Sequence, residues 1–514
     1  MTPKTDLNRR EFLGSAAASL AFTIVPRHVL GGPGYVAPND KIALAYIGCG
    51  TQGLREMVRL VANPEVQIVA VCDPEKDNTN YIDWSKDGIR NSIQKILEDP
   101  SWDSSGKGIR AGREVARELV QAYYAKKRSA ESFKGCTAYA DFRELLEKEK
   151  DINAVKVITP DHLHATVSLA AMKAGKHVVV QKPLANRVRE VRLVVETARK
   201  TGVATHLLAW RRPPDIVKTM IDDGAIGTVR EVHNWTDRPF WPQYQSLPTD
   251  TPPVPASFDW NLWLGPATDR PYHPHYTHAV FRGWYDFGGG SVADMGNYSL
   301  WPIFTTLDLP VPNTVEALVS STVEINEEQV SRINVNDFSF PNACQVRFTF
   351  PAQGSRPPIV LYWYDGGMRP WTPKELGMDK KPMPATGTLY VGDKGMILND
   401  QLLPEKKMQD YRQEKNLPPP QGGRRGGGGA GIDADAEWVQ AFKGVKPSAG
   451  NFLNAANCAE AIALAGVAMR YSRKNFRADR STPPLEWDAQ NMKITNIPEA
   501  NEYLTREYRE GWEL

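Results

Sequence analysis

The chain of 514 residues has only five cysteines, little net charge and few long hydrophobic runs. The cysteines are odd in number, widely spaced and without a Cys-x-x-Cys pair, which argues against a disulfide framework and a structural zinc site. Lysine and arginine number 62 and aspartate and glutamate 60, so the chain lacks the positive excess typical of proteins that bind nucleic acid. No segment beyond the N-terminus is expected to reach transmembrane length. These absences leave a globular chain of enzyme size.

The N-terminal segment has the pattern of an export signal. Residues 8–14 are Asn-Arg-Arg-Glu-Phe-Leu-Gly, and a weakly hydrophobic, alanine-rich run follows at 15–25. Two adjacent arginines before Phe-Leu and a short apolar run resemble a twin-arginine signal. The alternative is a short amphipathic helix with a basic start. We expect residues 1–38 to be signal and linker, the twin-arginine export machinery to be a partner, and the protein to be periplasmic, or membrane-anchored if the signal is not cleaved.

Residues 39–210 show an alternation of strands and helices that predicts a doubly wound parallel sheet, the Rossmann arrangement. Short apolar runs are typical of buried parallel strands, whereas apolar residues at helical spacing indicate the helices between them. Residues from about 78 to 135 interrupt this alternation and are expected to be an insertion. The predicted strands are 41–48, 66–72, 154–159, 177–181 and 203–208, and the predicted helices include 142–148, 166–174 and 188–200.

Residues 211–514 have longer predicted strands with few helices between them, which indicates a C-terminal α+β domain. Its sheet is expected to be large, open and mostly antiparallel, and the fold class of the whole chain is α/β. A glycine-rich loop is expected at 418–431 and C-terminal helices at 433–443 and 451–473. We expect a homo-oligomer that forms through this sheet. The predicted strands are 229–235, 315–325, 343–350, 358–364 and 387–399.

The first predicted strand ends in a Gly-x-Gly-x-x-Gly motif, Gly48-Cys49-Gly50-Thr51-Gln52-Gly53, which also begins a helix. Asp73 ends the next strand, 73 − 53 = 20 residues further on, as the dinucleotide-binding fingerprint requires. The glycines permit a tight turn and close approach to a pyrophosphate, which the helix N-terminus attracts. Asp73 would accept hydrogen bonds from ribose hydroxyls and repel a 2′-phosphate, so NAD is favoured over NADP. The alternative is a glycine-rich turn without a cofactor.

Two further segments follow the ends of later strands, where ligands of doubly wound sheets bind. They are Thr159-Pro160-Asp161-His162-Leu163-His164 and Gln181-Lys182-Pro183-Leu184. A third segment lies in the second domain, Gly288-Gly289-Gly290-Ser291-Val292-Ala293-Asp294-Met295-Gly296-Asn297-Tyr298. Together with the glycine motif, these segments resemble the Gfo/Idh/MocA family of oxidoreductases. Phe258-Asp259-Trp260 and the tail at 485–512 are similar to its exported bacterial branch.

The resemblance implies a site that oxidises an alcohol with a nicotinamide cofactor. Lys182 matches the family's catalytic lysine and Asp294 the aspartate of its Asp-x-Gly-x-His stretch, whereas Tyr298 stands where many relatives have histidine. Gln181 replaces the glutamate before the lysine, and its amide can still contact the cofactor ribose. The implied catalytic residues are Lys182, Asp294 and Tyr298; further cofactor contacts are Thr159, Pro160, His164, Gln181 and Lys182, and substrate contacts are His278, Arg282, Asp294 and Tyr298.

Several histidines have structural alternatives to a role in the site. His164 follows the Thr-Pro turn and lines the cofactor or substrate in one interpretation, and is a core histidine in the other. His273, His275 and His278 form a His-x-His-x-x-His pattern, but no carboxylate motif joins them and the spacing suits no common zinc site. No metal is therefore expected.

The expected function is that of an NAD-dependent oxidoreductase of carbohydrate metabolism. It would transfer a hydride between a hydroxyl carbon of a sugar, glycoside or polyol and a tightly bound nicotinamide cofactor. Two alternatives stay open. The same site could cleave a glycosidic bond through transient oxidation, with no net redox change, or the chain could be a non-catalytic protein that binds NAD or a sugar.

Overall fold

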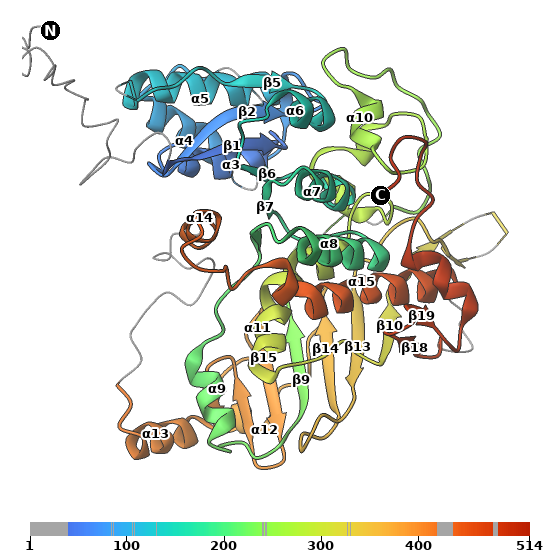
Figure 1. Cartoon of the computed structure of the whole chain (residues 1–514). Coiled ribbons are helices and arrows are strands. Elements are labelled where there is room, and N and C mark those ends of the chain that lie inside the picture. Colours follow the sequence, from blue (N-terminus) through green and yellow to red (C-terminus); the bar gives the residue numbers. More distant parts are fainter. Residues whose placement is uncertain are drawn as a thin grey trace, which may run out of the picture.

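The computed structural model describes residues 40–514 except 84, 86, 105, 107, 130, 239–240, 242–243, 326, 329, 419–434 and 476–481. The predicted signal and linker at 1–38 and nearly all of the glycine-rich loop at 418–431 lie outside the described residues. The described chain forms an N-terminal α/β domain above a C-terminal domain that is built on a large sheet (Figure 1).

The N-terminal domain contains a six-stranded sheet in the order β5-β2-β1-β6-β7-β8, in which every pair of neighbours is parallel. Leu44 and Tyr46 of the central strand pack into one core cluster, whereas Ala45 and Ile47 pack into another. Both faces of the sheet are therefore covered, and the doubly wound prediction is confirmed. The elements are β1 (Ile42–Ile47), α3 (Thr51–Leu60), β2 (Val66–Cys72), β5 (Thr137–Tyr139), α6 (Phe142–Lys148), β6 (Ala154–Val157), α7 (His164–Lys173), β7 (His177–Val180), α8 (Val188–Thr201) and β8 (Thr205–Leu207).

The segment expected to be an insertion folds against the sheet and extends its core. Ile93 and Leu119 belong to the same buried cluster as Leu54 and Met57 of α3. β3 and β4 pair with each other as an antiparallel ribbon. The segment thereby places residue 81 beside the start of α3. Its elements are β3 (Asn78–Tyr81), α4 (Gly88–Leu97), β4 (Ile109–Ala111) and α5 (Arg113–Lys127).

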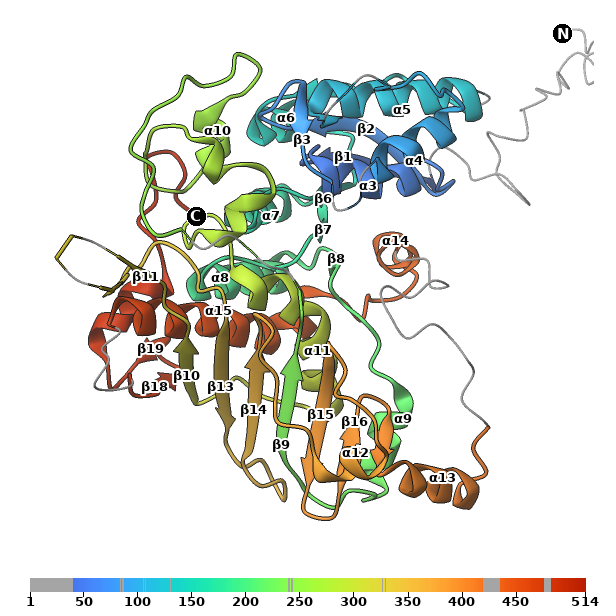
Figure 2. The ribbon, with the colours of Figure 1, turned by 180° about the vertical axis from the view of Figure 1, so that it is seen from behind.

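The C-terminal domain contains a nine-stranded sheet in the order β17-β16-β15-β9-β14-β13-β10-β18-β19. Figures 1 and 2 show its labelled strands side by side. β9 and β14 are parallel and the other neighbours antiparallel, so the mostly antiparallel prediction is confirmed. The strands are β9 (Val229–Trp235), β10 (Thr314–Val319), β13 (Cys344–Phe350), β14 (Ile359–Tyr364), β15 (Gly387–Gly392), β16 (Met396–Leu398), β17 (Gln401–Leu403), β18 (Leu485–Asp488) and β19 (Lys493–Ile494).

Two of the expected strands are wrong as single elements. The strand predicted at 315–325 leaves the sheet after Val319, and β11 (Val323–Glu324) pairs with β12 (Arg332–Ile333) in a separate ribbon. The strand predicted at 387–399 is a hairpin, because a turn closed by the Gly392 N–H and the Gly395 carbonyl reverses the chain. Apolar spacing alone shows neither break, since the residues on both sides have the same alternation.

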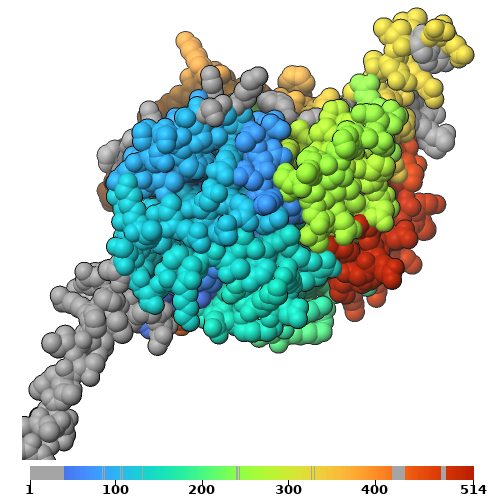
Figure 3. Space-filling view, turned by 90° about the horizontal axis from the view of Figure 1, so that it is seen from above, coloured from blue at the N-terminus to red at the C-terminus, as the bar shows by residue number. Residues whose placement is uncertain are grey.

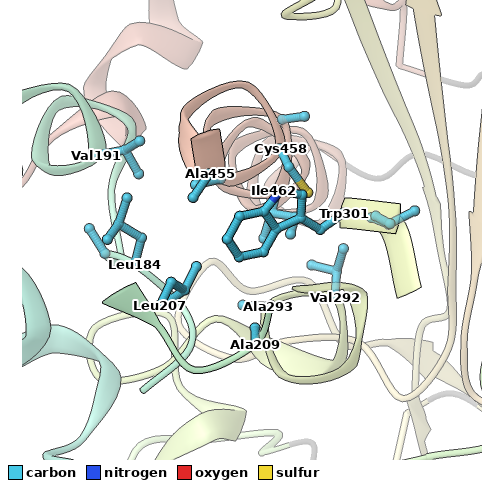
Figure 4. Packing of buried hydrophobic residues seen from close by; sticks show 14 of the residues in the cluster. Leu184, Val191, Leu207, Ala209, Val292, Ala293, Trp301, Ala455, Cys458 and Ile462 are labelled. Atoms are coloured by element: carbon cyan, nitrogen blue, oxygen red, sulfur yellow. The ribbon is translucent and has the colours of Figure 1, made fainter. Parts of the chain in front are cut away.

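Helices cover one face of the large sheet. α11 (Asn297–Leu307) and α15 (Phe452–Lys474) pack on it, and α8 of the N-terminal domain packs on α15, so the two domains share one core. Figure 4 shows the indole of Trp301 lying against α15 beside Cys458 and Ile462. The expectation that no segment beyond the N-terminus reaches transmembrane length is wrong for α15, which is the one helix of the described residues long and apolar enough to cross a membrane. Most of it is buried in this core. Further α-helices in this part of the chain are α9 (Asp215–Asp222), α12 (Lys374–Met378), α13 (Glu405–Glu414) and α14 (Ala436–Phe442).

An aromatic segment between β9 and α11 attaches the second domain to the first. Its short helix α10 (Trp260–Leu264) lies against the N-terminal domain, which Figure 3 shows as the contact between the green and blue surfaces. Backbone hydrogen bonds join Lys76 to Ser257 and Asp259 to Pro74, at 2.8 and 3.2 Å. The segment is therefore fixed directly beyond Asp73, at the carboxyl end of β2.

Candidate active site

The two domains enclose a cavity of about 440 Å³ at the carboxyl ends of the parallel strands. Ligands of doubly wound sheets bind at this edge. The structure brings all but one of the predicted site residues into its wall, and the exception is His164. The predicted residues that line the cavity are Gly48, Gly50, Thr51, Gln52, Gly53, Asp73, Thr159, Pro160, Gln181, Lys182, His278, Arg282, Asp294 and Tyr298.

The glycine motif forms a tight turn that only glycine fits. Gly48 has a φ of +100°, and a Cβ there would lie 2.2 Å from the Ile158 carbonyl oxygen. A Cβ on Gly53 would lie 2.2 Å from the Gly48 carbonyl oxygen, so this glycine permits α3 to pack on the turn. Gly50 is the N-cap of α3 and no side chain caps the helix. The first N–H groups of α3 therefore face the cavity as donors for an anion.

Asp73 is held in place by the turn that it faces. Its carboxylate accepts hydrogen bonds from the Cys49 N–H at 2.6 Å and from the Glu75 N–H at 2.8 Å. Burial raises the pKa of Asp73 to about 6, although these two hydrogen bonds oppose the shift. Each carboxylate oxygen keeps a further lone pair. Asp73 can thus accept a hydrogen bond from a ligand hydroxyl.

These features fit a dinucleotide. Gly50 has no side chain to cover its backbone in the cavity wall, and a Cβ there would lie 3.2 Å from the ring of Tyr81. The uncapped N-terminus of α3 suits a pyrophosphate, and Asp73 suits the diol of a ribose. Gly48, Gly50, Thr51, Gln52, Gly53 and Asp73 are the residues that would hold it.

Lys182 and Asp294 form a buried ion pair at the boundary between the domains. Lys182 follows β7, and Asp294 lies in the π-helical turn Val292–Gly296 that precedes α11; their exposed fractions are 8% and 6%. Burial alone would raise the pKa of Asp294, but the Lys182 ammonium and the Arg282 guanidinium outweigh it and hold this pKa below its ordinary value. Asp294 is therefore held as a carboxylate beside Lys182.

Arg282 joins the two domains around this pair. Its guanidinium lies 3.7 Å from Asp294 and 3.7 Å from the fully buried Asp161, which also accepts the Gly289 N–H at 3.1 Å. The Lys182 ammonium also lies 5.6 Å from the centre of the Tyr298 ring. Four of the predicted catalytic and substrate-binding residues thus lie together, across more than a hundred residues of sequence: Lys182, Arg282, Asp294 and Tyr298.

Gln181 has a structural reason to be an amide. Its side-chain N–H donates to the buried carboxylate of Glu56 in α3, and its carbonyl oxygen accepts the Lys182 N–H at 3.2 Å. Glu56 also pairs with Lys156 at 3.0 Å. A glutamate at 181 would set two buried carboxylates against each other, which is unfavourable. Gln181 therefore links α3 to the backbone of Lys182 while it lines the cavity.

His164 lies behind the site, in contrast to the expected cofactor contact. It is fully buried, and its two ring nitrogens lie 2.6 Å from the Pro183 carbonyl oxygen and 2.9 Å from that of Thr159. Both polar atoms of the ring are thus engaged by the backbone. The second interpretation of this residue, a core histidine, describes its position. It fixes the Thr159 turn to the segment that follows Lys182.

Sequence reasoning missed Tyr81, which comes from the insertion. Its ring contacts that of His278 in the second domain, with centroids 4.1 Å apart. Burial lowers the pKa of His278 to about 4, so the imidazole is neutral at ordinary pH. Tyr81 and His278 together bridge the domains over Gly50. Tyr81 belongs to no motif, and only its fold places it here.

Cysteine and histidine side chains are further candidates for a reactive or metal-binding group within the described residues. All five cysteines are buried free thiols. In the described residues, no group of three or more His, Cys, Asp or Glu side chains is arranged to hold a metal ion. His273 and His275 contact each other, with ring centroids 4.4 Å apart, while His278 faces Tyr81.

Comparison with known proteins agrees with this geometry. Residues 105–208 match the family model GFO_IDH_MocA, described as the oxidoreductase family with an NAD-binding Rossmann fold. Residues 215–348 match the model GFO_IDH_MocA_C2, described as the C-terminal alpha/beta domain of the oxidoreductase family. The two models thus match the two domains in their order along the chain.

Individual relatives match over shorter stretches. Levoglucosan dehydrogenase of Pseudarthrobacter phenanthrenivorans is 35% identical over 94 residues, which is 18% of this chain and 24% of the relative. A glycosyl hydrolase family 109 protein of Solibacter usitatus is 27% identical over 201 residues, 39% of this chain and 37% of the relative. The chain thus matches well under half the length of these relatives.

The solved structures that are similar to this chain include the WlbA dehydrogenase of Chromobacterium violaceum in complex with NADH and UDP-GlcNAcA. The match has a TM-score of 0.48 and 14% identity, and it covers 88% of this chain and 98% of that one. Over residues 105–208 and 215–348, the chain is thus similar to the NAD-binding Rossmann domain and to the C-terminal domain of the Gfo/Idh/MocA oxidoreductases.

Proposed function

We propose that this enzyme oxidises a secondary hydroxyl of a sugar, glycoside or polyol, with NAD as a tightly held cofactor. The observation that carries the proposal is the buried Lys182–Asp294 pair, which lies in the wall of the same cavity as the glycine motif. The oxidation removes a hydride from carbon and a proton from oxygen. NAD supplies the acceptor for the hydride, and the chain must supply the group that takes the proton.

Lys182 is the residue that handles this proton. It forms an ion pair with Asp294 in the cavity wall, where it can meet the oxygen of a substrate hydroxyl. Arg282 lies 3.7 Å from the same Asp294 carboxylate and helps to fix it. Lys182 lies 5.6 Å from the centre of the Tyr298 ring, so both side chains can contact the same substrate. Asp294 thus acts as a positioning residue for Lys182.

The test uses purified holoprotein with a panel of sugars, glycosides and polyols. NADH absorbance should increase with the correct substrate, and Lys182→Met should lower the rate by about 10²–10⁴-fold while NAD binding is unchanged. Arg212→Met is a matched control, because Arg212 is exposed and pairs with Asp215 outside the cavity. Full activity of Lys182→Met at saturating NAD would show that another group moves the proton.

A redox-neutral glycoside cleavage is the second candidate, and the glycosyl hydrolase family 109 relatives favour it. Oxidation of a hydroxyl acidifies the neighbouring C–H, and loss of that proton expels the glycosidic oxygen, which leaves as the protonated aglycone. Water then adds to the resulting double bond, and the hydride returns to the carbonyl carbon. The chain's residues are the same in both reactions. Release of the aglycone without accumulation of NADH would identify this cycle, whereas stoichiometric NADH identifies a dehydrogenase.

We also propose that the protein is exported with its cofactor bound and forms a homo-oligomer through the C-terminal sheet. The Arg9-Arg10 pair before Phe-Leu supports twin-arginine export, a route for folded proteins. Arg9→Lys with Arg10→Lys should leave the protein in the cytoplasm in a cell fractionation, and normal export of the double variant would contradict it. Sedimentation of the purified protein measures the oligomer.

A further inference from the structure

A second, smaller cavity lies behind the active site. It has a volume of about 30 Å³, and residues 185–187, which follow the Lys182 segment, form one wall. Gly289 and Ala293, which precede Asp294, form another wall, and Arg470 of α15 and Tyr285 complete the lining. The segments that carry Lys182 and Asp294 thus meet on both sides, at the ion pair in front and at this cavity behind.

Three buried polar groups of this lining have no hydrogen-bond partner among the described residues. The Tyr285 side chain is 3% exposed, and its hydroxyl is one of them. The Nε of Arg470 and the hydroxyl of Tyr503 are the other two. An apolar cavity of this size stays dry, but a buried donor without an acceptor is unfavourable. A small ligand that accepts hydrogen bonds would satisfy these donors.

The carboxylates near the cavity are paired with basic residues other than Arg470. Glu190 pairs with Arg506 at 2.8 Å, and Asp286 is shared by Arg270 and Arg187. Glu502 pairs with Lys474 at 3.0 Å, and Asp337 lies 3.5 Å from the same lysine. These pairings leave Arg470 with no carboxylate within 4 Å in the described part of the chain.

The electrostatics of the neighbours agree with a positive excess. Burial and the charges of Arg506 and Arg470 lower the pKa of Arg187. Burial alone would raise the pKa of Asp286, but Arg270, Arg187 and Arg470 hold it at about 2. Both shifts show that positive charge dominates this region of the core.

We propose that the cavity binds one small monoanion, a halide or a one-carbon carboxylate, which accepts from Tyr285 and neutralises Arg470. The volume has room for about one or two water molecules, so a halide or formate fits, whereas phosphate and sugar acids are too large. A bound anion would hold residues 185–187 against the turn that carries Asp294. Arg470 and Gly466 are partly exposed, so the anion can exchange with solvent.

The test uses full-length protein in sodium gluconate, in which chloride or bromide replaces gluconate at constant ionic strength. The melting temperature should rise and then saturate with the halide concentration, because the anion binds only the folded state. Tyr285→Phe removes one hydroxyl and keeps the ring contact with Phe340, and Arg470→Gln removes the charge. Both variants should lose the response. Tyr364→Phe, a control in the large sheet, should keep it.

Crystals grown in sodium bromide give a direct second measurement. An anomalous peak between the Tyr285 hydroxyl and the Arg470 guanidinium is expected, and it should be absent from Arg470→Gln crystals. Bromide at surface positions only would overturn the proposal. An equal response to halide in the wild type and in both variants would overturn it too, because that result reports a general effect of the salt.

Discussion

Replacement of Asp294 by asparagine should lower kcat for alcohol oxidation and leave NAD binding unchanged. The carboxylate pairs with Lys182 and holds its side chain in the cavity wall, where it can meet the substrate hydroxyl. Arg282 lies 3.7 Å from the same carboxylate, so in the variant it would lie beside Lys182 without a carboxylate between them. The Lys182 side chain should then leave the position in which it contacts the substrate oxygen.

The size of the effect follows from the geometry. Two unit charges about 4 Å apart interact by about 4 kcal/mol at an effective dielectric constant of about 20, and about 1.4 kcal/mol corresponds to a factor of about ten in rate. The carboxylate therefore accounts for at most about a thousandfold in kcat. Asparagine keeps a carbonyl acceptor and the cavity admits water, so we expect kcat to fall by about ten- to a hundredfold.

The assay is kcat for oxidation at saturating NAD and substrate, with the reverse reduction measured in parallel. Asp435→Asn is a matched control, because Asp435 forms a buried pair with Lys156 at 3.0 Å outside the cavity. It should lower stability and leave kcat unchanged. An unchanged kcat in Asp294→Asn would refute the assignment of Asp294 as the residue that positions Lys182.

Three further predictions concern the cofactor site. Gly48→Ala should destabilise the protein by about 3 kcal/mol or more in a denaturant titration, because its Cβ would clash with the Ile158 carbonyl at a φ of +100°. Gly202→Ala also adds a Cβ at positive φ but in open space, so the difference between the two variants measures the cost of the clash. NAD affinity should fall below about pH 6, as Asp73 becomes protonated, and titration calorimetry of Asp73→Asn should show no such change. Tyr81→Ala should accelerate NAD release about tenfold in a stopped-flow displacement, and an unchanged rate would place Tyr81 away from the cofactor.

Local sequence was sufficient for elements whose causes are local. The strand 229–235 and the helix 142–148 have the predicted bounds, because apolar spacing and the Asp141 cap lie within a few residues. The glycine motif was predictable for the same reason, since a turn from strand to helix at a pyrophosphate needs glycine at fixed offsets. The strand breaks after Val319 and Gly392 lie beside short hairpins, and the alternation of apolar residues continues on both sides of each break, so spacing could not show them.

The sequence by itself therefore determined the fold class, the glycine motif, Asp73 and the identity of Lys182 and Asp294 as charged groups at element ends. Only the tertiary structure decided that Lys182 and Asp294 meet, that Gln181 turns to Glu56, that His164 lies behind the turn, and that Tyr81 enters from the insertion. The physical reason is that local conformation depends on neighbours in sequence, whereas the charge state and orientation of a buried polar group depend on partners that folding brings from distant segments.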